Sequence, residues 1–227
     1  MLLSKLDQIR NRPCRKYYSL ISEVQKSILE NSTGVIHIGA HKGQEASDYA
    51  AHHLPVIWFE GDPEIFADLQ SYISKFDSQK AINALLGKKD GLDVDFFIAS
   101  NDGMSSSIHQ FGRDMNHEGL EMVQTKRLLM RRLDKLLSKN EAMKYSHWVI
   151  DVQGSELEVL EGAGELVDSA ASLEIEVSTR EEYAGGSKWP EVLDYLSSKG
   201  FFPLWKPEEG SHEDIVFLRN PKDKWDF

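Results

Sequence analysis

A glycine-rich turn and an acidic residue about 20 positions after it are the residues of this sequence best suited to hold a ligand. An apolar run that begins at Val35 breaks into a loop of small residues, Gly39, Ala40 and Gly43. Such a turn lets the backbone approach a ligand closely and directs free N–H groups of a helix start towards it. The next apolar run ends in Glu60, whose carboxylate can accept hydrogen bonds from two ribose hydroxyls. The pair indicates a cofactor that contains a nucleoside.

A second loop of similar character follows a later apolar run. Asp151 ends that run, and Gly154 permits a tight turn before Ser155 and Glu156 begin a predicted helix. Glu176 ends the next predicted strand. Strand capping or solvent exposure is the alternative interpretation of each carboxylate. Because doubly wound sheets bind ligands at the carboxyl ends of their strands, we expect this loop to face the ligand as well.

Strands and helices alternate along the chain in the order that builds a parallel sheet. The predicted strands occupy residues 35–39, 56–60, 80–85, 147–151 and 173–177, with a closing antiparallel pair near residues 201–205 and 214–218. The predicted helices occupy residues 44–53, 63–75, 155–162 and 188–199. The polar residues Glu60, Asn83, Asp151 and Glu176 should therefore meet at one edge of the sheet.

Two parts of the chain lie outside this alternation. Residues 1–33 have mainly helical spacing of apolar residues and are expected to form an N-terminal helical cap, which leaves residues 34–227 as one α/β domain. Residues 93–98 and 122–126 alternate polar and apolar side chains and predict two extra strands around the polar loop 100–118. The Gly and Ser content of that loop is typical of a mobile lid, and a solvated connection is the alternative.

Composition excludes several classes of protein. A length of 227 residues suits one large domain, and a net charge of −11 argues against a nucleic-acid surface. A local basic patch at residues 126–132 is interpreted as a solvated face, with contact to an anionic substrate as the alternative. The single cysteine cannot form an internal disulfide, and no apolar stretch approaches the ~20 residues of a membrane span. We expect a soluble, cytoplasmic protein.

Several motifs together resemble the FkbM-type S-adenosylmethionine-dependent methyltransferases. They are HIGAHKG at residues 37–43, WFEGDP at 58–63, SSS at 105–107, RLD at 132–134 and, most specifically, DVQGSELEVLEGA at 151–163. The resemblance implies a class I methyltransferase fold, which is a Rossmann-like seven-stranded sheet with helices on both faces and one antiparallel edge strand. It also implies S-adenosyl-L-methionine as the cofactor and a hydroxyl oxygen of a sugar, glycan or secondary metabolite as the acceptor.

The resemblance also implies roles for particular residues. Glu60 would hold the ribose, and the loop that begins at Asp151 would lie beside the reactive sulfonium. The full set of expected cofactor contacts is His37, Gly39, Ala40, His41, Gly43, Glu60, Asn83, Ala84, Ser105, Ser106, Asp151 and Gln153. Many members carry Asp where His37 stands and Lys where Val149 stands. His37 therefore has two interpretations, a contact to the methionine part of the cofactor and a histidine satisfied inside the sheet.

A sulfonium methyl group is a strong electrophile, so the protein must align the acceptor and remove its hydroxyl proton. The candidate bases are Asp151, Glu176 and two histidines of the polar loop, His109 and His117. We expect Asp151 to be essential near the sulfonium, with Glu176 or His109 completing the deprotonation. The carboxylates could also bind a divalent cation, but their spacing specifies no metal site.

Two functions of other classes fit parts of the pattern. A nicotinamide-dependent oxidoreductase shares the strand, glycine turn and distal carboxylate, but it should show a fuller Gly-x-Gly-x-x-Gly motif than Gly39 and Gly43 provide. A non-catalytic protein could retain the fold as a nucleoside-binding scaffold. The intact loop after Asp151 favours the enzyme. The acceptor and the oligomeric state do not follow from the sequence.

Overall fold

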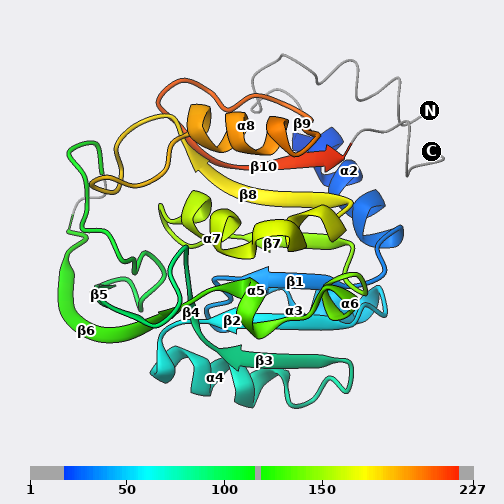
Figure 1. The fold of residues 1–227 in the computed structure, drawn as a ribbon, viewed down its shortest axis with the longest axis horizontal. Helices are drawn as coiled ribbons and strands as arrows, with labels where there is room; N and C mark the ends of the chain where they lie inside the picture. Colours follow the sequence, from blue (N-terminus) through cyan, green and yellow to red (C-terminus); the bar gives the residue numbers. More distant parts are fainter. Residues whose placement is uncertain (1–17, 116–118, 220–227) are drawn as a thin grey trace.

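A parallel sheet of short apolar strands forms the centre of the protein (Figure 1). The computed structural model describes residues 18–115 and 119–219. The five parallel strands are β1 (Val35–Ile38), β2 (Val56–Glu60), β3 (Gln79–Asn83), β7 (His147–Ile150) and β8 (Ser172–Ser178). Their β-branched and aromatic residues suit a sheet that is buried on both faces. All residues of β1 and β2 are buried.

Two further strands complete the sheet beside β8. They are β9 (Phe201–Pro203) and β10 (His212–Arg219), and the strand order is β3-β2-β1-β7-β8-β10-β9. β10 pairs antiparallel with both β8 and β9, so the reversed strand lies next to the edge. The predicted seven-stranded mixed sheet is thus confirmed, as is the antiparallel pair that closes it.

Helices cover both faces of the sheet. Helices α3 (Ala46–Ala51) and α4 (Pro63–Ile73) pack on one face through the core around Trp58, Leu69 and Ile73. On the other face lie α5 (Leu133–Leu136), α6 (Lys139–Ala142), α7 (Glu156–Ala163), the 3₁₀ helix η2 (Gly164–Ser169) and α8 (Trp189–Ser198). None of the helices in the described ranges is long and apolar enough to cross a membrane.

Helix α2 (Tyr18–Glu30) is the described part of the predicted N-terminal cap. Its apolar face contributes Ile21, Val24 and Ile28 to the main core. Gln25 of α2 also donates a hydrogen bond to Glu174 of β8 at 2.7 Å. This helix therefore packs on the sheet of the following domain, and residues 1–17 lie outside the described part of the chain.

A second, three-stranded sheet stands at the carboxyl ends of the parallel strands. It consists of β4 (Leu85–Leu86), β6 (Met122–Arg131) and β5 (Leu92–Ala99), and β5 pairs antiparallel with β6. Both extra strands predicted from the alternating segments are present and longer than expected. Figure 1 shows this sheet and the loop after β5 projecting beyond the ends of β1 and β2.

The basic patch on β6 is neutralised by carboxylates. Each of its four cations pairs with an acidic side chain, namely Lys126 with Asp62, Arg127 with Asp95, Arg131 with Asp90 and Arg132 with Asp134. The contacts join β6 to neighbouring elements, as between Lys126 and the residue that caps α4. The patch therefore links elements of the fold, and it is solvated only in part, since Lys126 is 13% exposed and Arg127 60%.

Candidate active site

A cleft with an open volume of about 640 Å³, including the part continuous with solvent, lies at the carboxyl ends of β1, β2 and β7. We call it the cofactor cleft. Its walls come from the glycine turn, the end of β2, the start of β4, the loop after β5 and the loop after β7. The predicted residues that line it are Gly39, His41, Glu60, Ala84, Ser106, Asp151 and Gln153. The strand-end argument therefore brings most of the predicted cofactor contacts to one place.

The glycine turn fits tightly between two strand ends. Gly39 has a φ of +84°, and a Cβ atom there would lie 1.6 Å from the carbonyl oxygen of Asp151. Only glycine permits this approach of the turn to the loop after β7. His41 follows with a φ of +44°, an uncommon conformation for a residue with a side chain. That conformation directs the His41 N–H to Glu60 Oε2 at 2.9 Å.

Glu60 lies at the floor of the cofactor cleft with 8% of its surface exposed. Its carboxyl group accepts backbone N–H groups from His41 at 2.9 Å and Asp62 at 2.7 Å. Burial raises the pKa of Glu60 to about 7, against the lowering effect of these N–H groups. The Gly61 N–H also acts on this carboxyl group. A carboxylate has about four lone-pair sites, so the three N–H groups leave room for a hydroxyl group of a ligand.

Apolar side chains form the wall beyond Glu60. Leu85, Leu86, Phe96 and Ile65 line this part of the cleft together with Ala84. Such a surface suits one face of a flat heterocycle. Asn83 points elsewhere, because its side-chain nitrogen donates to the carbonyl oxygen of Glu60 at 2.9 Å. It holds the end of β3 against the end of β2.

Part of the loop after β5 lines the cofactor cleft, and its mobility as a lid stays a prediction. Gly103, Met104 and Ser106 of this loop line the cleft. Asp102 anchors the loop to the glycine turn through an ion pair with Lys42 at 2.5 Å and a carbonyl contact to the His41 ring at 2.9 Å. The loop also accepts a hydrogen bond from the Tyr183 hydroxyl at the Ser105 carbonyl oxygen, at 3.2 Å.

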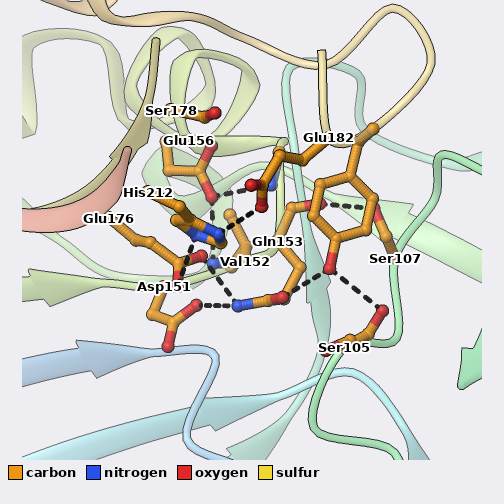
Figure 2. Close-up of polar contacts among 12 residues, drawn as sticks. Ser105, Ser107, Asp151, Val152, Gln153, Glu156, Glu176, Ser178, Glu182 and His212 are labelled. Carbon is orange, nitrogen blue, oxygen red and sulfur yellow. Dashed lines mark hydrogen bonds and ion pairs between the residues drawn. The ribbon is translucent and has the colours of Figure 1, made fainter. Parts of the chain in front are cut away.

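The side chain of Gln153 connects the two carboxyl groups that were predicted as catalytic (Figure 2). Its Nε2 donates to Asp151 Oδ1 at 2.6 Å and to Glu176 Oε2 at 2.7 Å. Its Oε1 accepts the hydroxyl of Tyr183 at 2.5 Å. Gln153 has a φ of +56°, and Ser107 Oγ donates to its carbonyl oxygen at 2.7 Å. Strained backbone of this kind is concentrated at functional sites.

Burial and mutual repulsion raise the proton affinity of this group. Burial and the nearby charge of Glu176 raise the pKa of Asp151 well above its usual value. Burial, with the charges of Glu156 and Asp214, raises the pKa of Glu176 in the same direction. The pKa of Glu156 rises to about 7 for the same main reason, burial. Carboxyl groups with raised pKa values suit general-base work near neutral pH.

A second, shallow hollow lies on the other side of residues 151–156, with an open volume of about 280 Å³ that includes the part continuous with solvent. Its lining consists of Gly154, Glu156, Glu176, Val177, Ser178, Arg180, Glu182, Tyr183, Gly186, Ser187 and His212. Asp151 and Gln153 line the cofactor cleft, whereas Glu176 lines only this second hollow. The two predicted catalytic carboxylates therefore face different spaces.

A chain of charged groups leads away from Glu176 through the second hollow. His212 Nε2 contacts Glu176 Oε1 at 2.7 Å, and His212 Nδ1 contacts Glu182 Oε2 at 2.5 Å. Arg180 Nη2 lies 2.6 Å from Glu182 Oε1. Our sequence analysis missed His212, Glu182 and Arg180. The available signal was weak, since β10 begins at His212, before the predicted strand 214–218, and the others lie on an irregular segment.

Several predicted residues lie outside both spaces. His37 is buried in the sheet, stacked on Trp58 at 4.7 Å, and its Nδ1 lies 3.1 Å from the Tyr49 hydroxyl. Burial, with a smaller effect of His147, lowers the pKa of His37 to about 3, so the ring is neutral. The geometry supports the interpretation of His37 as a core histidine.

The remaining predicted contacts pack or pair with protein groups. Ala40 is buried in the core, and a Cβ atom at Gly43 would lie 2.7 Å from a methyl group of Leu69. Ser105 hydrogen-bonds to Asn101 within the lid. His109 lies 3.9 Å from Glu158 of α7 and lines neither space. His117 lies outside the described residues.

Metal ligation was also considered for the carboxylates. Within residues 18–115 and 119–219, no group of three or more His, Cys, Asp or Glu side chains is arranged to hold a metal ion. The acidic groups near Glu176 instead bond to Gln153, His212 and backbone N–H groups.

Comparison with known proteins shows the family of this chain. The model of the methyltransferase FkbM domain matches residues 37–203. The 2-O-methyltransferase NoeI of Sinorhizobium fredii (strain NBRC 101917 / NGR234) is 27% identical over 211 residues, which cover 86% of this chain and 83% of that protein.

Solved structures show the fold. The crystal structure of magnesium protoporphyrin IX methyltransferase (ChlM) from Synechocystis PCC 6803 with bound SAH superposes with a TM-score of 0.51 at 9% identity. The superposition covers 91% of this chain and 83% of that one. The same protein with bound SAM gives a TM-score of 0.49 at 10% identity over 91% and 79% of the two chains. With the family match over most of its length, the chain belongs to the FkbM family of S-adenosylmethionine-dependent methyltransferases.

Proposed function

We propose that this methyltransferase transfers the methyl group to a hydroxyl oxygen of a sugar, a glycan or a related secondary metabolite. The observation that carries the proposal is the position of Glu176. Its buried carboxyl group lines a separate hollow, hydrogen-bonds to Asp151 of the cofactor cleft and shares the amide nitrogen of Gln153 with it. A hydroxyl is a poor nucleophile until its proton is removed, and a carboxylate of raised pKa meets that need. The name of the relative NoeI, a 2-O-methyltransferase, also supports oxygen as the acceptor atom.

The residues of the cofactor cleft fit S-adenosylmethionine. Glu60 keeps acceptor capacity for a ribose hydroxyl, and the apolar wall of Leu85, Leu86 and Phe96 suits the adenine ring. Gly39 and Asp151 also line the cleft, and they would hold the methionine part. When bound, the cofactor supplies an electrophilic methyl group on a positively charged sulfur.

Each polar side chain then has a separate task. Asp151 lines the cofactor cleft, where the positive charge of a bound sulfonium would favour the ionised carboxyl group against the burial that raises its pKa. Glu176 lies on the acceptor side, takes the hydroxyl proton as the O–CH₃ bond forms and the S–CH₃ bond breaks, and returns it to solvent after product release. Gln153 holds both carboxyl groups in place through its amide nitrogen. Alignment of donor and acceptor by such fixed groups lowers the activation free energy by about several kcal/mol.

The test is transfer of a labelled methyl group from S-adenosylmethionine to panels of hydroxyl, amine and thiol compounds, with the products identified by mass spectrometry. We expect label on hydroxyl oxygen. Label only on nitrogen or sulfur would overturn the choice of oxygen. Cofactor binding without transfer to any compound, even at high enzyme concentration, would instead favour a non-catalytic nucleoside-binding protein.

A further inference from the structure

Tyr183 lies where three segments of the chain meet. It belongs to the segment between β8 and α8, and only 5% of its surface is exposed. Its hydroxyl donates to Gln153 Oε1 at 2.5 Å and lies 3.2 Å from the carbonyl oxygen of Ser105 in the loop after β5. Its ring lies against the ring of Phe111 from the same loop, with the ring centres 5.8 Å apart. Tyr183 therefore contacts both the loop beside the cofactor cleft and the amide between the two carboxyl groups.

The backbone around Tyr183 is fixed on two sides. On one side it pairs with the loop after β5, through a β-bridge between Tyr183 and Phe111 and a hydrogen bond from the Gly112 N–H to the Glu182 carbonyl oxygen at 2.6 Å. On the other side it packs on Gly154, where a Cβ atom would lie 2.9 Å from Tyr183 Cβ. The direction of the Tyr183 hydroxyl is thus set by two other segments.

The amide of Gln153 is used on both of its sides. Its nitrogen donates to Asp151 and Glu176 (Figure 2), so both N–H groups are occupied. Its oxygen points the other way and accepts the Tyr183 hydroxyl. Burial, with the nearby charge of Glu176, raises the pKa of Tyr183 well above its usual value, so the hydroxyl keeps the proton that it donates.

Loss of that hydroxyl would leave the Gln153 amide oxygen without this donor in a buried place. A buried polar group without its partner is unfavourable, and the amide would turn or shift to regain one. The same movement would take the N–H groups away from the carboxyl oxygens of Asp151 and Glu176. Because N–H donors stabilise the ionised form of a carboxyl group, the proton affinity of both groups would then rise.

The neighbours of the carboxyl pair act in the opposite direction to the amide. Gln153 lowers the pKa values of Asp151 and Glu176, whereas burial raises both. The charged groups that face the pair from other elements are Glu156 of α7, His212 and Asp214 of β10 and, through His212, Glu182 and Arg180. Most of these groups are acidic, so the donors to the pair are few and the loss of one should be measurable.

We propose that Tyr183 is a positioning residue whose hydroxyl keeps the amide of Gln153 turned towards Asp151 and Glu176, and that the loop after β5 seats its ring. Tyr183 acts through Gln153 on the pair. Its effect on turnover rests on the proposed function, in which Glu176 takes the proton of the acceptor.

Tyr183→Phe tests the hydroxyl, because it keeps the ring. Tyr195→Phe is the matched control, since the Tyr195 hydroxyl donates to the Leu160 carbonyl oxygen at 3.0 Å and lines neither space. The titration of Glu176 is followed by carbon-13 NMR of the carboxyl groups in the S-adenosylhomocysteine complex, with Glu176→Gln to assign the signal. We expect the midpoint to rise by about half a pH unit or more in Tyr183→Phe and to stay unchanged in the control. An unshifted midpoint in a folded Tyr183→Phe protein would overturn the inference.

A double-mutant cycle tests the route through Gln153. The kcat of Tyr183→Phe, Gln153→Ala and the double variant is measured with the acceptor that takes the label in the panel above. We expect Tyr183→Phe to lower kcat about tenfold alone and by less than about twofold when Gln153 is already replaced by Ala. Equal reductions in both backgrounds would overturn the route through Gln153.

Phe111→Leu is a second variant that leaves the hydroxyl in place and loosens the seat of the ring. We expect the Glu176 midpoint to move in the same direction as in Tyr183→Phe, and by less. An unchanged midpoint in a folded Phe111→Leu protein would overturn the role of the loop after β5.

The two kinds of measurement separate this positioning role from the proposed function. A raised Glu176 midpoint with an unchanged kcat would support the hold of Tyr183 on the pair and would refute Glu176 as the general base. A lower kcat with an unshifted midpoint would overturn the positioning role and leave the general base untouched.

Discussion

The carboxyl groups of Asp151 and Glu176 are joined through a single amide nitrogen, which lies 2.6 Å from an oxygen of the first and 2.7 Å from an oxygen of the second. The amide belongs to Gln153, whose oxygen is occupied by a tyrosine hydroxyl. Because the two carboxyl groups line different spaces, their substitution should have separable effects on cofactor binding and on turnover.

Glu176→Gln should lower kcat by roughly 10²- to 10⁴-fold, the usual contribution of a general base. Affinity for S-adenosylhomocysteine should change little, since Glu176 does not line the cofactor cleft. Asp151→Asn should lower kcat and should also lower the affinity for S-adenosylhomocysteine. His109→Ala is the control and should retain near-normal turnover. A folded Glu176→Gln protein with normal kcat would show that another residue is the general base.

Glu60→Gln should weaken S-adenosylhomocysteine binding by about tenfold or more, because a charge-assisted hydrogen bond contributes about 1.5 kcal/mol or more. Calorimetry measures the change directly. Glu64→Gln, on an exposed side chain four residues later, should bind with wild-type affinity. Equal affinity of the Glu60 and Glu64 variants would refute the ribose assignment.

Gly39→Ala should destabilise the fold by several kcal/mol. The added Cβ would meet the Asp151 carbonyl oxygen at 1.6 Å, so the turn and the loop after β7 must separate. Gly91→Ala is the matched control, because Gly91 also has a positive φ, +75°, but a Cβ there has no described atom within 4 Å. Gly91→Ala should lower the free energy of unfolding by about 1–2 kcal/mol. Chemical denaturation of both proteins would show whether the close approach, rather than φ alone, sets the cost.

The unfolding free energy of the free protein should fall as the pH rises from 5 to 8. Burial raises the folded-state pKa values of Glu60, Glu156 and Glu174 to about 7. It also raises the pKa values of Asp151 and Glu176 well above their usual range. A raised pKa gives stability that is complete below the unfolded pKa and is lost as the pH passes the folded pKa. Two buried histidines, His37 and His147, oppose the trend only below about pH 6.5, because their pKa values are lowered.

Glu174 provides a variant that tests this trend outside the proposed catalytic group. Its pKa of about 7 follows mainly from burial, and it contacts Gln25 of α2. Glu174→Gln should raise the unfolding free energy at pH 8, by up to about 3 kcal/mol, and change it little at pH 5. An equal effect at both pH values would show that the carboxyl group is not the titrating group.

A chelator should leave cofactor binding and turnover intact. This follows from the bonding of the acidic groups to the amide of Gln153, the ring of His212 and backbone N–H groups. The measurement compares dialysed enzyme with and without EDTA. Loss of binding that magnesium restores would contradict it.

The sheet was predictable because its strands are short apolar runs that end in polar residues. The same feature identified Glu60, Asp151 and Glu176, since strand ends meet at one edge. The sequence pattern could not show which side of a turn each residue faces. His37 and Gly43, which were expected to contact the cofactor, instead pack against Trp58 and Leu69. The division of the chain at residue 33 stays a prediction.

The second hollow was harder to predict for a physical reason. Its residues come from the start of α7, the end of β8, the irregular segment 179–187 and β10, an antiparallel strand. No periodicity fixes a side-chain direction in an irregular segment, and the register between β8 and β10 depends on the intervening 33 residues rather than on a tight turn. The contacts of Tyr183 with Gln153 and of Glu182 with His212 follow only from the tertiary structure.

The loop of residues 151–156, which lies between the two spaces, also bears on how this enzyme could diversify. The cofactor cleft draws on the first half of the sheet, whereas the second hollow draws on β8, β10 and the segment between β8 and α8. With the proposed base Glu176 on that side, substitutions in the last third of the chain would change the acceptor side of the reaction without disturbing the methyl donor. Directed evolution for new acceptors should therefore concentrate its libraries at positions such as Ser178, Arg180 and Ser187.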